Sequence, residues 1–129
     1  MAKEFTIGKT KVGGNNPCFI VAEIGINFDA NYKKALKLID AAAKAGCNAV
    51  KFQMFKASTM YLENTGEDKS ADGRKKNIYK IVKDSQLPIL WVGKLKKYAN
   101  KLRLEFFLTT CDESDTDLLE KYNVAAYKI

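Results

Sequence analysis

The chain has 129 residues, of which 47% are hydrophobic and 29% are charged, a composition that predicts one folded domain or part of one and excludes an intrinsically disordered protein. Its 22 Lys and Arg residues outnumber its 15 Asp and Glu residues, which suits an anionic ligand, but they form no dense basic or basic-aromatic motif that would predict nucleic-acid binding. No stretch approaches the ~20 apolar residues of a membrane span and the amino terminus has no signal-like apolar region, so we expect a cytoplasmic protein without a membrane partner.

The first segment of the chain predicts a short antiparallel ribbon. Residues 5–12 alternate weakly between polar and apolar side chains, and residues 13–17 are a run of turn-forming residues. We therefore expect residues 1–16 to form a hairpin that covers the bottom of the fold. The continuous apolar run of residues 18–22 then predicts a strand that is buried on both faces and ends at Glu23.

A helix and a second strand follow within a short distance. Asp29 or Asn31 can cap a helix whose apolar residues recur at helical spacing, and Gly46 is the usual type of residue to end it. Residues 48–53 form the next predicted strand. A strand, a helix and a strand this close together predict parallel strands that are joined by a right-handed crossover.

The strand at residues 48–53 carries polar side chains on one face. Strand side chains alternate, so Lys51 and Gln53 share one face while Val50 and Phe52 share the other. A ligand site at the carboxyl end of a parallel strand would explain this pattern. The alternative is a lysine that extends from the end of the strand into solvent.

The segment between the second and third strands has a weaker pattern. Residues 54–86 contain a charged run at residues 68–76 and a brief apolar repeat at residues 78–82, which predict a long loop with one short helix. Pro88 suits the first turn of a further helix. The apolar side of that helix is predicted to consist of Trp91, Leu95, Tyr98 and Leu102.

The last third of the chain predicts two more strands. Residues 105–108 form an apolar strand that ends at Thr109 and Thr110, and Asp112 or Ser114 can cap the helix that follows. Residues 124–127 form the fourth predicted strand, which ends at Lys128.

All four predicted strands end on polar residues, and parallel strands place their carboxyl ends at one edge of the fold. The residues expected at this edge are Glu23, Lys51, Gln53, Thr109, Thr110 and Lys128. Two ammonium groups and the threonine hydroxyls would supply charge-assisted hydrogen bonds to a phosphate or a carboxylate. The sequence therefore predicts an anion site at the strand ends.

Four segments of the chain together resemble the N-acetylneuraminate (sialic acid) synthase family. They are CFIVAEIGIN at residues 18–27, the stretch from DAA to AVKFQ at residues 40–53, FLTT at residues 107–110 and AYKI at residues 126–129. The resemblance runs from about residue 7 to residue 129 and is weak only in the loop after the second strand.

The resemblance implies an α/β fold, the (β/α)8 TIM barrel, in which residues 17–129 supply the amino-terminal half with four parallel strands. Such a barrel takes ~250 residues, so the other strands and a carboxy-terminal sugar-clamping domain would lie outside this chain. Members of the family condense phosphoenolpyruvate with an N-acetylated sugar such as N-acetylmannosamine, and release a nonulosonic acid and phosphate. Manganese or magnesium polarises the sugar aldehyde in that family.

Positions within the matched motifs imply roles for five residues. Lys51, Thr110 and Lys128 are expected to bind phosphoenolpyruvate. Glu23 and Gln53 are expected on the sugar side, with Glu23 also a candidate catalytic residue. The resemblance places the metal-binding histidines after residue 129, and this chain contains no histidine and only three well-separated cysteines. We therefore expect no ligands for the divalent metal within this chain.

Two departures from the family pattern bear on the site. Phe28 stands where the family usually has histidine, and Cys111 and Asp112 stand where it has proline and an aromatic residue. The favoured hypothesis is a part of a sialic acid synthase-like enzyme that is inactive alone. The alternatives are a non-catalytic half-barrel that binds an anion or pairs with another chain, and another aldolase-type synthase that uses phosphoenolpyruvate. The exposed edges of a half-barrel also predict a homodimer or similar association.

Overall fold

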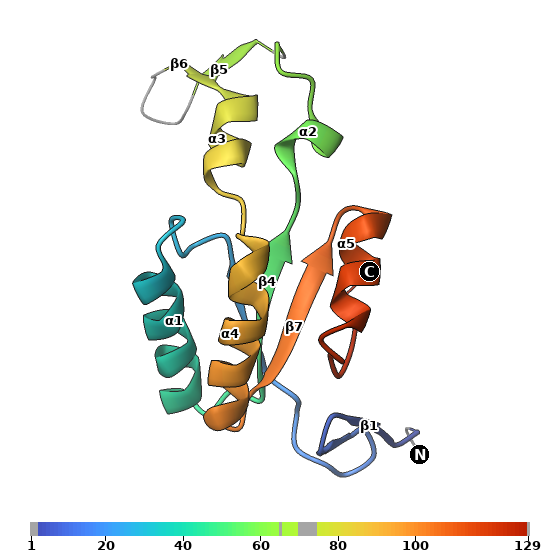
Figure 1. Cartoon of the computed structure of the whole chain (residues 1–129). Helices are drawn as coiled ribbons and strands as arrows, with labels where there is room; N and C mark the ends of the chain where they lie inside the picture. Colours follow the sequence, from blue (N-terminus) through green and yellow to red (C-terminus); the bar gives the residue numbers. More distant parts are fainter. Residues whose placement is uncertain (1–2, 65, 70–74, 129) are drawn as a thin grey trace.

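A three-stranded parallel sheet with three helices on one of its faces forms the framework of the protein (Figure 1). The computed structural model describes residues 3–64, 66–69 and 75–128. The strand order is β3 (Val21–Gly25), β4 (Ala49–Met54) and β7 (Glu105–Thr110), and the covering helices are α1 (Tyr32–Lys44), α4 (Ile89–Lys101) and α5 (Glu113–Glu120). Among the described residues, every helix is too short or too polar to cross a lipid bilayer.

The first strand of the sheet begins later than its apolar run predicts. β3 starts at Val21 and contains Glu23, whereas residues 18–20 lead into it as extended chain. The prediction that this run is buried on both faces is wrong, because Ile20 and Val21 are 52% and 37% exposed. The helices cover only one face of the sheet, which leaves Val21, on the other face with Glu23, in contact with solvent. Asn48 fixes the start of the strand, since its side-chain oxygen accepts a hydrogen bond from the backbone N–H of Ile20 at 2.8 Å.

The predicted βαβ unit is confirmed. α1 begins after Asn31, whose side chain accepts a hydrogen bond from the backbone N–H of Lys34 at 3.0 Å. Of the two predicted caps, Asn31 therefore holds the position, and Asp29 lies in the preceding turn. The helix ends at Lys44, and Gly46 follows its C-cap with a φ of +77° that suits glycine. β3 and β4 then pair in parallel, with Val21 opposite Ala49.

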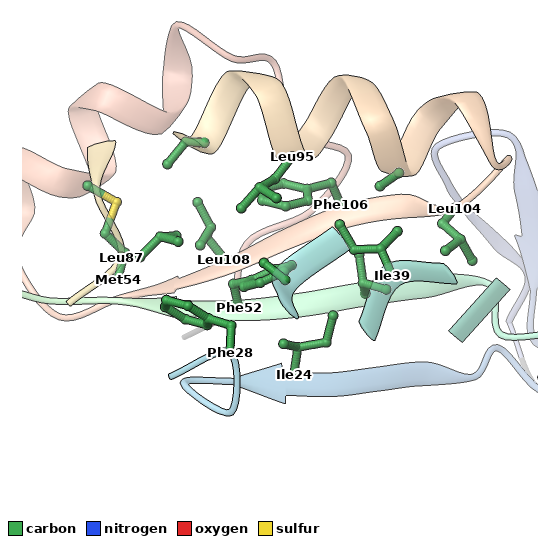
Figure 2. Packing of buried hydrophobic residues seen from close by; sticks show 14 of the residues in the cluster. Ile24, Phe28, Ile39, Phe52, Met54, Leu87, Leu95, Leu104, Phe106 and Leu108 are labelled. Carbon is green, nitrogen blue, oxygen red and sulfur yellow. The ribbon is translucent and has the colours of Figure 1, made fainter. Parts of the chain in front are cut away.

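A single cluster of apolar side chains lies between the sheet and its helices (Figure 2). Phe52 of β4 is at its centre, with ring centroids 5.9 Å from Phe28 and 5.6 Å from Phe106. Ile39 of α1 and Leu95 of α4 are fully buried against the same cluster. This packing fixes the register of β4, because a shift by one residue would turn Lys51 into the core.

The long segment after β4 folds into more elements than the predicted loop with one helix. The predicted short helix is confirmed as α3 (Ile78–Asp84), while α2 (Ala57–Met60) and the antiparallel pair β5 (Glu67–Lys69) and β6 (Lys75–Asn77) had no clear sequence pattern. We call residues 57–86 the excursion. Its two ends meet where the backbone N–H of Ala57 donates to the side-chain oxygen of Gln86 at 2.7 Å. The centre of the charged run, at residues 70–74, lies outside the described residues.

The helix after the excursion begins one residue after the predicted proline. Pro88 is the residue that precedes the first turn of α4, where a missing backbone N–H costs no helical hydrogen bond. The buried residues of α4 are Val92, Leu95 and Ala99. Only Leu95 belongs to the predicted apolar side, since the large rings and Leu102 lie half-buried beside this stripe.

The third strand of the sheet agrees with the prediction, whereas the fourth does not form. β7 pairs in parallel with β4 along its whole length, with Ala49 opposite Glu105 and Met54 opposite Thr110. Residues 124–127 are not a strand in the described structure. The segment instead makes one parallel bridge, between Thr109 and Lys128. It contains two alanines, which are weak strand formers, and buries only Val124.

Short local structures complete the two ends of the chain. The predicted hairpin is confirmed by β1 (Phe5–Ile7) and β2 (Thr10–Val12), which pair in antiparallel fashion. Asp112 precedes α5 and accepts a hydrogen bond from the backbone N–H of Ser114 at 2.8 Å, so it holds the capping position that the sequence left open between these two residues. Ile129, the last residue of the AYKI motif, lies outside the described residues.

Candidate functional site

Strand register brings polar residues together on the face of the sheet that the helices leave uncovered. Glu23 of β3 is opposite Lys51 of β4, and Lys51 is opposite Phe107 of β7. One step toward the carboxyl ends, Gln53 is opposite Thr109. Residues that are opposite each other in neighbouring strands point to the same face, so these side chains form one group.

Lys51 is the centre of this group. Its ammonium forms an ion pair with Glu23 and donates a hydrogen bond to the hydroxyl of Thr109 at 3.2 Å. Only 15% of the Lys51 side chain is exposed, against 50% for Glu23. A cation that is this well shielded interacts strongly with a nearby anion, because less water separates the charges. The carboxylate, in contrast, remains accessible to solvent and to a ligand.

Gly25 keeps Glu23 and Gln53 close to each other. It has a φ of +54° and lies at an irregularity in the pairing of β3 with β4. A Cβ atom at this position would lie 3.2 Å from the Oε1 atom of Glu23 and 3.8 Å from the side-chain amide of Gln53. Glycine therefore allows the turn and leaves space beside both polar groups. The predicted group of Glu23, Lys51 and Gln53 is thus brought together.

The threonine beside Lys51 is Thr109. Both Thr109 and Thr110 were expected at this edge, with phosphoenolpyruvate binding assigned to Thr110. Thr110 is opposite Met54 and points to the helix-covered face, where its hydroxyl lies 2.8 Å from the hydroxyl of Thr116 in α5. The register of β7 against β4 decides which threonine joins the group, because it places Thr109 on the face of Lys51 and Gln53. A role for Thr110 in binding phosphoenolpyruvate stays a prediction.

Thr110 and Lys128 meet at a neighbouring cavity. It has a volume of about 500 Å³, and its lining also includes Asp112, Thr116 and Tyr127. The backbone of Lys128 bridges to Thr109, which joins this segment to the strand that carries the Lys51 contact. The structure therefore places the five predicted residues in two adjacent groups, one around Lys51 and one that contains Thr110 and Lys128.

A further ion pair near the strand ends was not apparent from the sequence. Lys56, just after β4, contacts Asp115 of α5 at 2.8 Å and donates to the hydroxyl of Ser114 at 3.0 Å. The hydrogen bond with Asp115 raises the pKa of Lys56 above its usual value, because it stabilises the charged ammonium. Asp115 is only 1% exposed. The pair connects the beginning of the excursion to α5 across 59 positions of sequence, which no local pattern could reveal.

Hydrogen bonds also lower the pKa of Asp112, the residue that caps α5. The hydroxyl and the backbone N–H of Ser114 both donate to its carboxylate and lower the pKa of Asp112. Lys56 contributes to this shift through its positive charge. Asp112 is therefore an ionised, hydrogen-bonded carboxylate at the mouth of the cavity that Thr110 and Lys128 share.

The described residues of this chain do not fit a divalent metal. Within residues 3–64, 66–69 and 75–128, no group of three or more His, Cys, Asp or Glu side chains is arranged to hold a metal ion. The three cysteines are free thiols at separate places, and the sequence has no histidine.

Comparison with known proteins identifies relatives of the whole chain. The model of the NeuB family matches residues 38–129. The chain is 42% identical to the spore coat polysaccharide biosynthesis protein SpsE of Bacillus subtilis and 34% identical to the N,N'-diacetyllegionaminic acid synthase of Legionella pneumophila, over 97% and 91% of its length. In both cases it spans about a third of the relative's own length, at 34%.

Solved structures agree with this assignment. The chain superimposes on the N-acetylneuraminic acid synthetase of Leptospira borgpetersenii with a TM-score of 0.84 and 33% identity, and it covers 41% of that protein. Its superposition on SpsE gives a TM-score of 0.75 with 40% identity over 33% of that chain. The α/β unit described above therefore matches one piece of a larger synthase.

Proposed function

This chain belongs to the NeuB family, and from that membership we propose that it supplies the anion-binding part of a sialic acid synthase-like active site. In the proposed reaction, the methylene carbon of phosphoenolpyruvate attacks the aldehyde carbon of an N-acetylated sugar. Water adds to the resulting oxocarbenium carbon, and the carbon–oxygen bond to phosphate breaks to release inorganic phosphate and a nonulosonic acid. N-acetylmannosamine is the proposed type of sugar.

The state of Lys51 is the observation that carries the proposal. Its ammonium is shielded from water yet lies on the uncovered face of the sheet, beside a threonine hydroxyl. A phosphate or carboxylate group at this place would receive two hydrogen bonds, one of them charge-assisted. Lys128 and Thr110 are proposed to contact the other end of phosphoenolpyruvate from the adjacent cavity.

Glu23 gives the site a way to respond to its ligand. In the structure it neutralises Lys51, so an incoming anion must take its place. Once released, the Glu23 carboxylate can accept a hydrogen bond from a hydroxyl of the sugar, and the Gln53 amide can bind the same substrate. We propose that phosphoenolpyruvate binding thereby prepares the sugar side of the site.

The proposed enzyme requires more chain than these 129 residues. We propose that β3, β4 and β7 are the first three strands of a (β/α)8 barrel, and that residues 124–128 complete a fourth strand when the next strands pair with it. Residues 17–129 would then be one partial barrel domain, and a manganese or magnesium ion would be held by residues from elsewhere. We propose that the 129-residue chain alone has no synthase activity, either in the cytoplasm or in vitro.

Titration with phosphoenolpyruvate, followed by calorimetry or backbone amide shifts, tests the proposed site. We expect Lys51→Met to weaken binding by about tenfold or more, as the loss of a charge-assisted contact of roughly 1.5–3 kcal/mol requires. Lys80→Met is the matched control, because Lys80 is an exposed lysine of α3. Equal affinities of the wild-type protein and the Lys51→Met variant would refute the proposal.

Association with a second copy of the chain is a second candidate function, and the uncovered face of the sheet favours it. Val21 remains exposed there, Ile20 is exposed just before β3, and β3 has no neighbour on its outer edge among the described strands. An exposed strand edge beside apolar side chains is a common site of pairing between chains.

A further inference from the structure

A second polar cavity lies at the opposite end of the sheet from Lys51. Figure 1 shows β1 beside the start of β7, away from the arrowheads of β4 and β7 where the candidate site lies. The cavity has a volume of about 700 Å³. Its walls are the hairpin turn at residues 8–10, Lys96 and Asn100 of α4, residues 103–105 and residues 123–125. We call it the basal cavity.

The basal cavity has an excess of positive charge. Lys9, Lys96 and Arg103 line it, and Glu105 is its only acidic lining residue. Within the described part of the chain, none of the three cations forms an ion pair. Glu105 is already engaged, because its carboxylate packs against Gly8 and accepts a hydrogen bond from the backbone N–H of Lys9 at 3.4 Å. Three cations therefore surround a space in which only one carboxylate opposes them.

The backbone at Arg103 is in the left-handed region at the border of the basal cavity. Arg103 follows the end of α4 with a φ of +62°, as Gly46 follows the end of α1 with a φ of +77°. Glycine is the residue that this conformation favours, and an arginine there lowers stability. Arg103 is one of four described non-glycine residues with a positive φ, together with Asp29, Ala30 and Asn123, and Asn123 also lines the basal cavity.

We propose that the basal cavity binds a small phosphate-bearing molecule, at a site separate from the one around Lys51. Its volume lies within the ~300–1,000 Å³ typical of ligand pockets. The guanidinium of Arg103 presents a fork of N–H donors that matches phosphate oxygens, and the two lysines add charge. Asn100 and Asn123 also line the cavity, and their side-chain amides would supply hydrogen bonds to the hydroxyl groups of an organic phosphate.

Inorganic pyrophosphate is a suitable probe, with binding followed by the backbone amide shifts of the 129-residue chain. We expect saturable shifts at residues 8–10 and 103–105. Arg103→Gly should weaken this binding by about tenfold or more while it keeps or raises the melting temperature, since glycine suits the backbone there. Lys9→Met should weaken binding without any change in the backbone. Lys94→Met is the control, because Lys94 is an exposed lysine of the same helix that does not line the cavity.

The design separates this proposal from the proposed active site. Lys51→Met should leave the shifts around the basal cavity unchanged. Unaltered affinity in both Arg103→Gly and Lys9→Met would overturn the proposal, as would shifts that are confined to residues around Lys51 and disappear in Lys51→Met. Shifts that rise linearly with pyrophosphate and never saturate would also overturn it, because they report only general screening of surface charge.

Discussion

Replacement of Glu23 by glutamine should change stability and anion affinity in opposite directions. An exposed ion pair contributes about 0–1 kcal/mol, and removal of one partner from a buried pair costs about 3–5 kcal/mol. Lys51 is 15% exposed and Glu23 is 50% exposed, so the pair lies between these limits. We expect Glu23→Gln to lower the free energy of unfolding by about 1 kcal/mol, which for a chain of this size lowers the melting temperature by about 4 °C.

The same interaction opposes the binding of an anion. Phosphoenolpyruvate must separate Glu23 from Lys51 in the wild-type protein, whereas in the Glu23→Gln variant no opposite charge is displaced. An energy of about 1 kcal/mol then corresponds to roughly fivefold tighter binding. Differential scanning calorimetry and titration with phosphoenolpyruvate measure the two quantities on the same samples.

A surface ion pair provides the matched control. Asp29 pairs with Lys34 at the surface, with 72% of the Asp29 side chain exposed. Asp29→Asn should change neither the affinity for phosphoenolpyruvate nor, by more than a few tenths of a kcal/mol, the stability. The reasoning fails if Glu23→Gln binds phosphoenolpyruvate more weakly than the wild-type protein, or if Asp29→Asn produces the same gain in affinity.

Three further outcomes are expected. Gly93→Ala should destabilise the protein by about 1 kcal/mol despite the better helix propensity of alanine, because the new Cβ atom would lie 2.9 Å from the ring of Tyr122. In a Tyr122→Leu background the same substitution should stabilise the protein. Equal effects on stability in both backgrounds would contradict the packing argument. Asp115 raises the pKa of Lys56, so the pair stabilises the protein below the ordinary lysine pKa of 10.5 and loses this effect as the pH rises through the raised value. The difference in melting temperature between the wild-type protein and Lys56→Met should therefore shrink at strongly alkaline pH, and a difference that persists there would exclude an ionic origin. Finally, sedimentation at micromolar concentration should show self-association or aggregation, and a monodisperse monomer that melts cooperatively would show that the exposed sheet is tolerated.

The parts of the fold that the sequence predicted correctly are those governed by local periodicity. Alternation in β4 predicted which of its residues face the core. One of the two predicted caps, Asn31, and the predicted glycine, Gly46, lie just outside the two ends of α1. These signals depend on neighbours within a few positions, where steric and hydrogen-bonding preferences are strong. The parallel direction of β3 and β4 followed from the short helical connection between them.

The missed features depend on partners that are distant in sequence. The choice between Thr109 and Thr110 required the register of β7 against β4, and the Lys56–Asp115 pair required the position of α5 relative to the excursion. The burial of residues 18–22 was overestimated because an apolar run does not by itself show that other elements cover both faces of a strand. The same limit applies to residues 124–127, since a strand forms only where a neighbouring backbone accepts its hydrogen bonds.

The hydrogen bond between Ala57 and Gln86 has a consequence for how this protein can change over evolutionary time. Because the excursion starts just after β4, ends just before α4 and has its two ends joined by this hydrogen bond, its length and composition can vary while the distance between its ends stays fixed. The added cost of closing a longer loop grows only slowly, at ~0.6 kcal/mol for each doubling of length. Related proteins can therefore exchange this segment as a unit, and acquire new surface next to the strand ends, without repacking the core around Phe52.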